Sequence, residues 1–178
     1  MPFFKFLDDS PGIWKIFAHN EARYGPIHRF KKNIMRGPSA LSLGERELIA
    51  AFVSALNRCQ FCASGHTANA ANLGIDVALL QGLLASVDDA AISDRLKPIF
   101  RFVKKLTEQP AQIVQADAEA VFAAGWDETA LGDAIAICAY FNMVNRLVDG
   151  HGLKATATDL DTPAGCRAAS RAAPACLR

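Results

Sequence analysis

Two cysteines and a histidine lie close together near the middle of the chain, as Cys59, Cys62 and His66. On a helix, residues three and four positions apart face the same way, so these side chains would share one surface. A thiol reacts as its thiolate, and a helix N-terminus, a nearby cation and a Cys-X-X-Cys spacing each favour that form. His66 is placed to exchange a proton with Cys62, because imidazole gains and loses protons near neutral pH.

This arrangement predicts two-thiol peroxide chemistry. The thiolate of Cys62 would attack an oxygen of a hydroperoxide and become a sulfenic acid, which a neighbouring thiol, Cys59, would condense into a disulfide. An external dithiol must then reopen the disulfide. The cycle needs neither a metal nor an organic cofactor, so we expect none.

Two other interpretations of the same residues stay open. Cys-X-X-Cys with a downstream histidine supplies three ligands of a zinc site, but the fourth is missing nearby. His151, Glu47 or a tail cysteine would have to complete the site from a distance. The protein could therefore be a zinc-stabilised binding protein, or a dithiol redox sensor that does not turn over.

The composition is that of one ordinary globular domain. The 178 residues suffice for one sizeable core, whereas two ordinary domains would need roughly 100 to 200 residues each. The formal net charge of +1 gives no electrostatic reason to expect nucleic-acid or membrane-surface binding. Asp8 and Asp9 interrupt the apolar stretch that a signal peptide needs, and no segment approaches the roughly 18 to 20 apolar residues of a membrane span. We therefore expect a cytoplasmic protein with reduced thiols.

The periodicity of apolar residues predicts helices throughout and no strand, which indicates an all-α packed bundle. Ser42 and Glu45 fit a reciprocal capping box at the start of a strong helix. Gly74 is expected to end the helix that begins near Cys59, and Asp127 to cap the last long one. The expected helices begin at Ser10–Pro11 and then run over about 26–35, 43–56, 59–73, 76–84, 93–106 (regular from Pro98), 117–123 and from Asp127 to about 147.

The same periodicity predicts which faces point inward. Glu47 shares a face with the small residues Ala50, Ala51 and Ser54, which could pack closely against another helix. The residues expected to point inward are Ile27, Phe30 and Ile34 in the second helix, Leu48, Ile49, Phe52, Val53 and Leu56 in the third, and Leu131, Ile135, Cys138, Phe141 and Val144 or Leu147 in the last.

The end of the chain differs in composition from the rest. We assign residues 1–155 to one helical domain and 156–178, which contain Cys166 and Cys176, to a poorly ordered or extended tail. His19, His28 and His151 have no partner at catalytic or ligand spacing and are expected to pack or lie at the surface. Cys138 falls on an apolar stripe and is expected to be a buried small hydrophobe.

The composite spacing of Glu47, eleven residues, Cys59, two residues, Cys62, three residues and His66 resembles the alkylhydroperoxidase AhpD-like branch of the carboxymuconolactone decarboxylase superfamily. The later run Phe-Asn-Met-Val-Asn-Arg at 141–146 is similar to a segment of the peroxidase-related members. The polar residues of this run and the nearby Asp149 form a set of four, and we interpret most of them as facing solvent, a protomer interface or a pocket rim. They are Asn142, Asn145, Arg146 and Asp149.

The resemblance implies roles for four residues. Cys62 would attack the peroxide, Cys59 would donate a proton and resolve the sulfenic acid, and His66 with Glu47 would form a proton relay, directly or through water. It implies an AhpD-like multi-helix bundle that reduces alkyl hydroperoxides or hydrogen peroxide with an external dithiol, of the thioredoxin-like or lipoyl type. It also implies a homo-oligomer with sites near subunit interfaces.

One position departs from the family pattern. The best-known form of the family has a relay histidine just before the second cysteine, where this chain has Phe61. This departure bears on the efficiency of the relay and on the substrate, since an aromatic side chain could favour an apolar peroxide or simply pack in the core. The decarboxylase branch lacks the thiol pair as its working group, so lactone decarboxylation is not expected.

Overall fold

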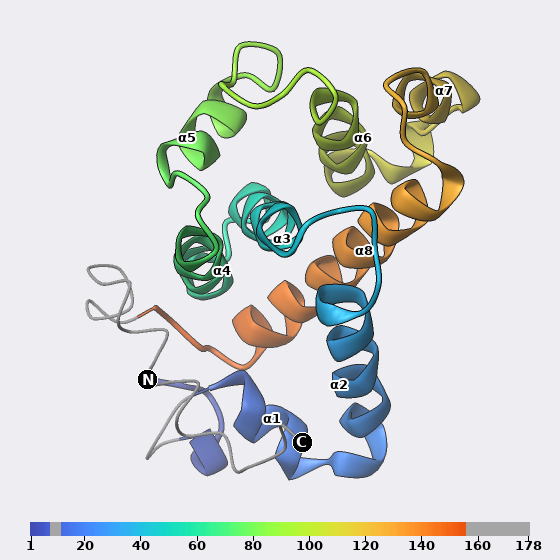
Figure 1. Ribbon diagram of the computed structural model, residues 1–178. Coiled ribbons are helices and arrows are strands. Elements are labelled where there is room, and N and C mark those ends of the chain that lie inside the picture. The colour runs from blue at the N-terminus through green and yellow to red at the C-terminus, as the bar shows by residue number, and fades with distance from the viewer. Residues whose placement is uncertain (8–11, 156–178) are drawn as a thin grey trace.

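The computed structural model describes residues 1–7 and 12–155, and these residues form helices and connecting loops with no strand (Figure 1). The predicted all-α fold is therefore confirmed for this part of the chain. The expected cap at Ser10–Pro11, the 156–178 tail and Cys166 and Cys176 lie outside the described residues, and the division at residue 155 stays a prediction. The elements are η1 (Lys5–Leu7), α1 (Ile13–His19), α2 (Glu21–Arg36), α3 (Leu43–Leu56), α4 (Gln60–Asn72), α5 (Ala78–Ala85), α6 (Lys97–Glu108), η2 (Pro110–Gln112), α7 (Gln115–Ala123) and α8 (Glu128–Gly150).

Helix α3 is the centre of the bundle. It packs against α4 and α5 on one side and against α6 and α8 on the other (Figure 1). A helix that is apolar nearly all round must be buried nearly all round, and here Ile49, Phe52 and Val53 are completely buried. Ala50 and Ala51 are also completely buried, and their small size permits the close approach of α4 that is the most extensive helix contact in the fold.

The junction between α3 and α4 sets the position of the thiols. The start of α3 carries the predicted capping box: the Ser42 N–H donates to Glu45 Oε2 at 2.7 Å and the Glu45 N–H to Ser42 Oγ at 3.2 Å. At its other end Arg58 adopts the left-handed conformation with φ of 59°, which reverses the chain within one residue. Cys59 follows as the N-cap of α4, and its N–H donates to the Ser54 carbonyl at 2.9 Å.

Helix α2 begins five residues before the predicted start. The Asn20 side chain accepts from the Arg23 N–H at 3.0 Å and caps it there, so Pro26 lies inside the helix. The prediction that Phe30 points inward was wrong, because its side chain is 46% exposed and contacts the ring of Tyr140 on one side. Ile34 and Met35 carry the buried contact of α2 instead.

Helix α8 is the longest element and contacts α2, α3, α4, α6 and α7. Its predicted cap is present, with the Ala130 N–H donating to Asp127 Oδ1 at 2.8 Å. The prediction that Ile135 points inward was wrong, because the buried stripe runs through Ala134 and Cys138. Residue 135 lies about 100° further round the helix than 134 and is exposed.

Local signals elsewhere in the sequence give the expected structure. Gly74 has a positive φ of 86° and its N–H donates to the Ala71 carbonyl at the end of α4. Pro98 is the second residue of α6, where proline is tolerated. Within the described ranges, no helix is long and apolar enough to cross a membrane.

Candidate active site

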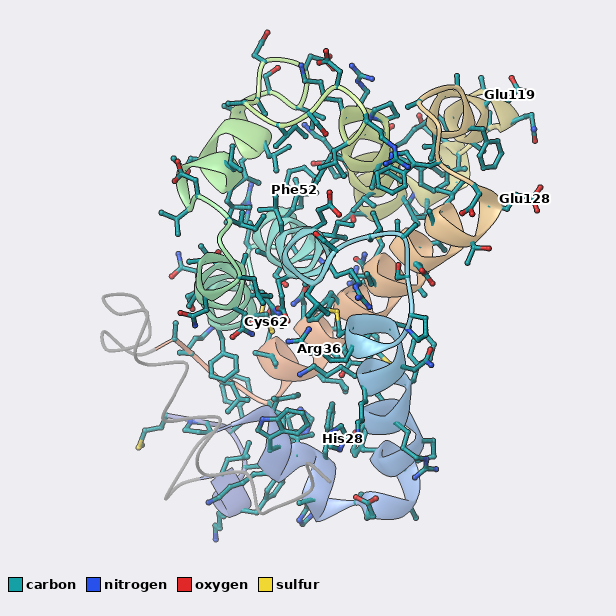
Figure 2. All side chains as sticks on the ribbon, viewed as in Figure 1. His28, Arg36, Phe52, Cys62, Glu119 and Glu128 are labelled. Atoms are coloured by element: carbon teal, nitrogen blue, oxygen red, sulfur yellow. The ribbon has the colours of Figure 1, made fainter. Side chains whose placement is uncertain are left out.

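The two thiols lie at the start of α4. Cys62 lies beside the C-terminal half of α8 (Figure 2). Cys59 is the N-cap residue and is completely buried, whereas Cys62 is 6% exposed. Cys62 is therefore the sulfur that can be reached from outside. The two thiols affect each other's pKa, and Asn145 and Asp149 of α8 are further groups that affect the pKa of the pair.

A cavity of about 120 Å³ opens at Cys62. Its wall is mostly aromatic and aliphatic, and Cys59 is not part of it. The residues that line it are Ile13, Trp14, Phe17, Lys31, Phe61, Cys62, Gly65, His66, Asn69, Tyr140, Phe141 and Val144. A cavity of roughly 150 Å³ with apolar walls holds a benzene molecule, and this one is smaller, so it has room for a small alkyl group next to the sulfur.

Glu47 is almost completely buried and holds His66 in place. Its Oε2 atom accepts from Nδ1 of His66 at 2.5 Å, while Oε1 accepts from a guanidinium nitrogen of Arg36 at 2.5 Å. Asn69 donates to the same Oε2 at 3.4 Å. Because an ionised carboxylate only accepts, Nδ1 of His66 carries the proton, and Nε2 is the nitrogen left for the cavity.

These partners keep Glu47 ionised. Burial alone would raise the pKa of this carboxyl, but the hydrogen bond and charge of His66, followed by those of Arg36, lower it to about 2. The side chain of Arg36 is 46% exposed, so its share of this stabilisation is screened by water. The bond to His66 is the stronger support.

The thiols titrate as a coupled pair. The hydrogen bond from Cys62 lowers the pKa of Cys59, and the same bond, together with burial, raises the pKa of Cys62. A proton shared between two sulfurs can lie on either one. The titration therefore belongs to the pair rather than to one residue. Which sulfur is the nucleophile depends on whether a substrate can reach it and on the groups next to each thiol. Cys62 lines the cavity and Cys59 does not, so access favours Cys62.

The four residues selected from the sequence lie in one region of the structure. Glu47 contacts His66, both Cys62 and His66 line the cavity, and Cys59 lies behind Cys62. Because Nδ1 of His66 is taken by Glu47, a proton passes between His66 and Cys62 only across the cavity, through Nε2.

Two groups at the site were not expected from the sequence. Arg36 comes from the end of α2, and nothing in its spacing pointed to Glu47. Asn145 is one of four polar residues most of which were expected at solvent, an interface or a pocket rim, but it is 1% exposed and is hydrogen-bonded to Ser54 of α3. It lies four residues after Phe141 and seven after Cys138, on the buried stripe of α8, so its burial could have been read from the helical repeat.

The remaining histidines and Cys138 have packing roles. His19 stacks on Phe6 at 4.0 Å, His28 contacts Trp14, and Nδ1 of His151 bonds the Leu147 carbonyl. Cys138 is buried, which raises the pKa of its thiol.

The fourth ligand that a zinc site needs does not converge on the thiols in the described part of the chain. No group of three or more His, Cys, Asp or Glu side chains among these residues is arranged to hold a metal ion. Glu47 is engaged by Arg36 and His66, and His151 by Leu147.

Comparison with known proteins shows what the part of the chain that holds this site is similar to. The model of the carboxymuconolactone decarboxylase family matches residues 26–105, which contain Glu47 and both thiols. An uncharacterized peroxidase-related protein from Silicibacter sp. TM1040 is 28% identical, with a TM-score of 0.77 over 85% of this chain and 79% of its own. Residues 26–105 are therefore similar to the carboxymuconolactone decarboxylase family, and the fold over most of the chain is similar to that of a peroxidase-related protein.

A second solved structure has a similar fold. It is an alkylhydroperoxidase AhpD core, an uncharacterized peroxidase-related protein from Ralstonia eutropha JMP134, with a TM-score of 0.77 and 22% identity. The alignment covers 88% of this chain and 84% of that protein. No functionally curated protein shows a significant sequence match. The structural likeness thus extends over more of the chain than the family match, which ends at residue 105.

Proposed function

We propose that the protein is a thiol-dependent peroxidase that reduces alkyl hydroperoxides or hydrogen peroxide at Cys59 and Cys62. The observation that carries the proposal is the placement of Cys62 and His66 on the wall of one largely apolar cavity, with Cys59 buried at the N-cap of the same helix, three residues before Cys62. The similarity of residues 26–105 to the carboxymuconolactone decarboxylase family, and of the fold to a peroxidase-related protein, supports the same reaction class.

In the first step the Cys62 thiolate attacks the outer oxygen of ROOH and breaks the O–O bond. Cys62 is oxidised to a sulfenic acid, and the alkoxide leaves as ROH with the proton of Cys59. The Cys59 thiolate then attacks the Cys62 sulfur, and hydroxide leaves as water with a proton delivered through Nε2 of His66. Glu47 holds the ring for this transfer.

The second half of the cycle reduces the disulfide. An external dithiol, thioredoxin-like or lipoyl-bound, exchanges with it and returns both cysteines to the reduced state. Overall, ROOH and one dithiol become ROH, water and one external disulfide. We further propose that the protein works in the cytoplasm as a homo-oligomer.

The test is turnover of cumene hydroperoxide with dithiothreitol, comparing wild type with Cys62→Ser and Cys138→Ser. We expect loss of turnover in Cys62→Ser, because serine is not oxidised to a sulfenic acid. Cys138→Ser should keep it, because Cys138 lies outside the cavity. Equal rates in wild type and Cys62→Ser would reject the proposal.

Two further results would point elsewhere. One stoichiometric oxidation without turnover would identify a redox sensor. Zinc bound stoichiometrically to the purified protein, and lost in Cys62→Ser, would identify a zinc-stabilised protein.

A further inference from the structure

Lys31 of α2 lines the cavity beside Cys62, and the proposed reaction makes no use of it. The rest of the wall is mostly aromatic and aliphatic, with Cys62 and His66 as the residues of the reaction. Among the described residues that line the cavity, none is an aspartate or a glutamate. A positive charge on a wall of this kind decides which molecules the cavity attracts.

Lys31 is held at the cavity by a residue of α1. Its Nζ atom lies 4.7 Å from the centre of the Trp14 ring, within the range of a cation–π contact. His28, three residues earlier on the same face of α2, lies between α1 and α2 with its ring centre 4.8 Å from that of Trp14 (Figure 2). Trp14 also lines the cavity. The indole therefore positions the ammonium group of the half-buried Lys31 on the cavity wall.

The groups that hold His66 add little net charge of their own. Glu47 is negative and accepts hydrogen bonds from His66 and from Arg36, which is positive. The charges of Glu47 and Arg36 therefore offset each other. Asp149 of α8 adds a negative charge near the thiols, but it does not line the cavity. A molecule that enters the cavity meets the positive charge of Lys31 on the wall itself.

The size and the apolar wall of the cavity limit the rest of the molecule. The volume of about 120 Å³ is below the roughly 150 Å³ that holds benzene, so only a few carbon atoms fit beside the sulfur. Phe61, Phe141 and Val144 give this part of the wall an apolar surface, which favours an alkyl segment. An ammonium group has three N–H donors, so Lys31 can bind a carboxylate and keep its contact with an aromatic ring.

We propose that Lys31 is a specificity-determining residue and that the substrates are short-chain hydroperoxides that carry a carboxylate. The ammonium group binds the carboxylate and the apolar wall holds the alkyl segment, so the hydroperoxide group lies at the sulfur of Cys62. The inference rests on the proposed function for its reaction and adds the class of substrate. The chemical steps are those given above, because the carboxylate takes no part in them.

Two alkylating reagents test the charge preference without peroxide turnover. Iodoacetate and iodoacetamide both alkylate a thiolate and differ in charge but hardly in size. The rate at which each modifies Cys62 is measured by mass spectrometry, and the ratio of the two rates is divided by the same ratio for the neutral thiol N-acetylcysteinamide. We expect this corrected ratio to be about ten in the wild type, the effect of one charge-assisted hydrogen bond in a partly exposed site.

Three variants of α2 test whether the preference comes from Lys31. Lys31→Met removes the charge with little change in length, so the corrected ratio should fall to that of the neutral thiol. Lys31→Arg keeps the positive charge and should restore the preference. Lys32→Met is the matched control, because it removes the same charge at an exposed neighbouring position that does not line the cavity. Its ratio should equal that of the wild type.

The same contrast applies to peroxides. The probes are 3-hydroperoxy-3-methylbutanoate and its amide, with dithiothreitol as the reductant. We expect kcat/KM for the carboxylate to exceed that for the amide by about tenfold in the wild type and in Lys32→Met, and this preference to be lost in Lys31→Met. Added salt should weaken the preference, because it screens the charge of Lys31.

The results separate the inference from the proposed function. A corrected ratio in the wild type no higher than that of the neutral thiol would overturn the inference. An equal fall of both alkylation rates in Lys31→Met would also overturn it, since Lys31 would then act on the thiolate or the fold. If Lys31→Met does not fold, the wild-type ratio and its salt dependence decide.

The two assays together distinguish the remaining cases. A charge preference in alkylation without turnover of either peroxide would reject the proposed function and leave Lys31 as the carboxylate-binding residue. Turnover of the two peroxides with equal kcat/KM would support the proposed function and reject the role of Lys31.

Discussion

Glu47 is the buried charge that positions His66, and Glu47→Gln removes this charge with almost no change in volume. The carboxylate accepts from His66 and Arg36 at 2.5 Å each. A glutamine can accept with one atom only, so its NH₂ group must face one of these two donors. We therefore expect one charge-assisted bond to be lost and the other to be weakened.

The size of the effect follows from the pKa of Glu47. Its fall from the ordinary 4.5 to about 2 corresponds to about 3 kcal/mol that favours the ionised form in the folded protein. A hydrogen bond to a charged group contributes about 1.5 to 3 kcal/mol. The bonds from His66 and Arg36 together give a similar value when the contribution of the half-exposed Arg36 is reduced for screening by water. Glu47→Gln should therefore lower the free energy of unfolding by about 3 kcal/mol at pH 7.

The pH dependence separates charge from packing. Because the pKa of Glu47 is lowered in the folded state, its contribution is complete above about pH 4.5 and is lost as the pH falls through about 2. The difference between wild type and Glu47→Gln should shrink to about 1.5 kcal/mol at pH 3. Urea unfolding followed by circular dichroism at pH 7 and pH 3 measures both values.

Glu45→Gln is the matched control on the same helix. Its side-chain oxygen can still accept from the Ser42 N–H, so we expect a loss below about 0.5 kcal/mol. A difference for Glu47→Gln that stays constant from pH 7 to pH 3 would show that packing rather than charge is responsible. No difference at pH 7 would refute the buried ion pair itself.

Two further changes test the thiol roles and the α3–α4 junction. Cys59→Ser should react once with cumene hydroperoxide and then stop, because Cys62 lacks its resolving thiol. Dimedone labelling of Cys62 detects the sulfenic acid, and sustained turnover would contradict the assignment of Cys59 as the resolving thiol. Arg58→Gly should raise the free energy of unfolding by about 0.5 to 1 kcal/mol, because the φ of 59° strains a residue with a side chain but not glycine. A lower thermal midpoint for Arg58→Gly would show that the Arg58 side chain contributes more than its backbone conformation costs.

The sequence predicted best those features that depend on residues a few positions apart. The capping box of Ser42 and Glu45, the end of α4 at Gly74 and the cap at Asp127 all fall in this class. The start of α2 was placed too late because Pro26 gives a strong local signal, while Asn20 is a cap only when its side chain turns to the Arg23 N–H.

Features that join distant helices could not be predicted in the same way. Glu47 was selected through a family resemblance, and its partner Arg36 depends on how α2 ends against α3. Asn145 illustrates the limit more sharply, since its place on the buried stripe of α8 was visible in the helical repeat. A buried amide is stable only with partners, and those partners, Ser54 and Asn57, come from α3 and its end, about ninety residues earlier in the sequence.

The surroundings of Cys62 combine one proton carrier with apolar surface. His66, held by Glu47, can take up and release protons near neutral pH. Phe61 lies on the cavity wall, where its ring adds apolar surface rather than a proton carrier. Proton transfer in the proposed cycle therefore relies on His66 and Cys59.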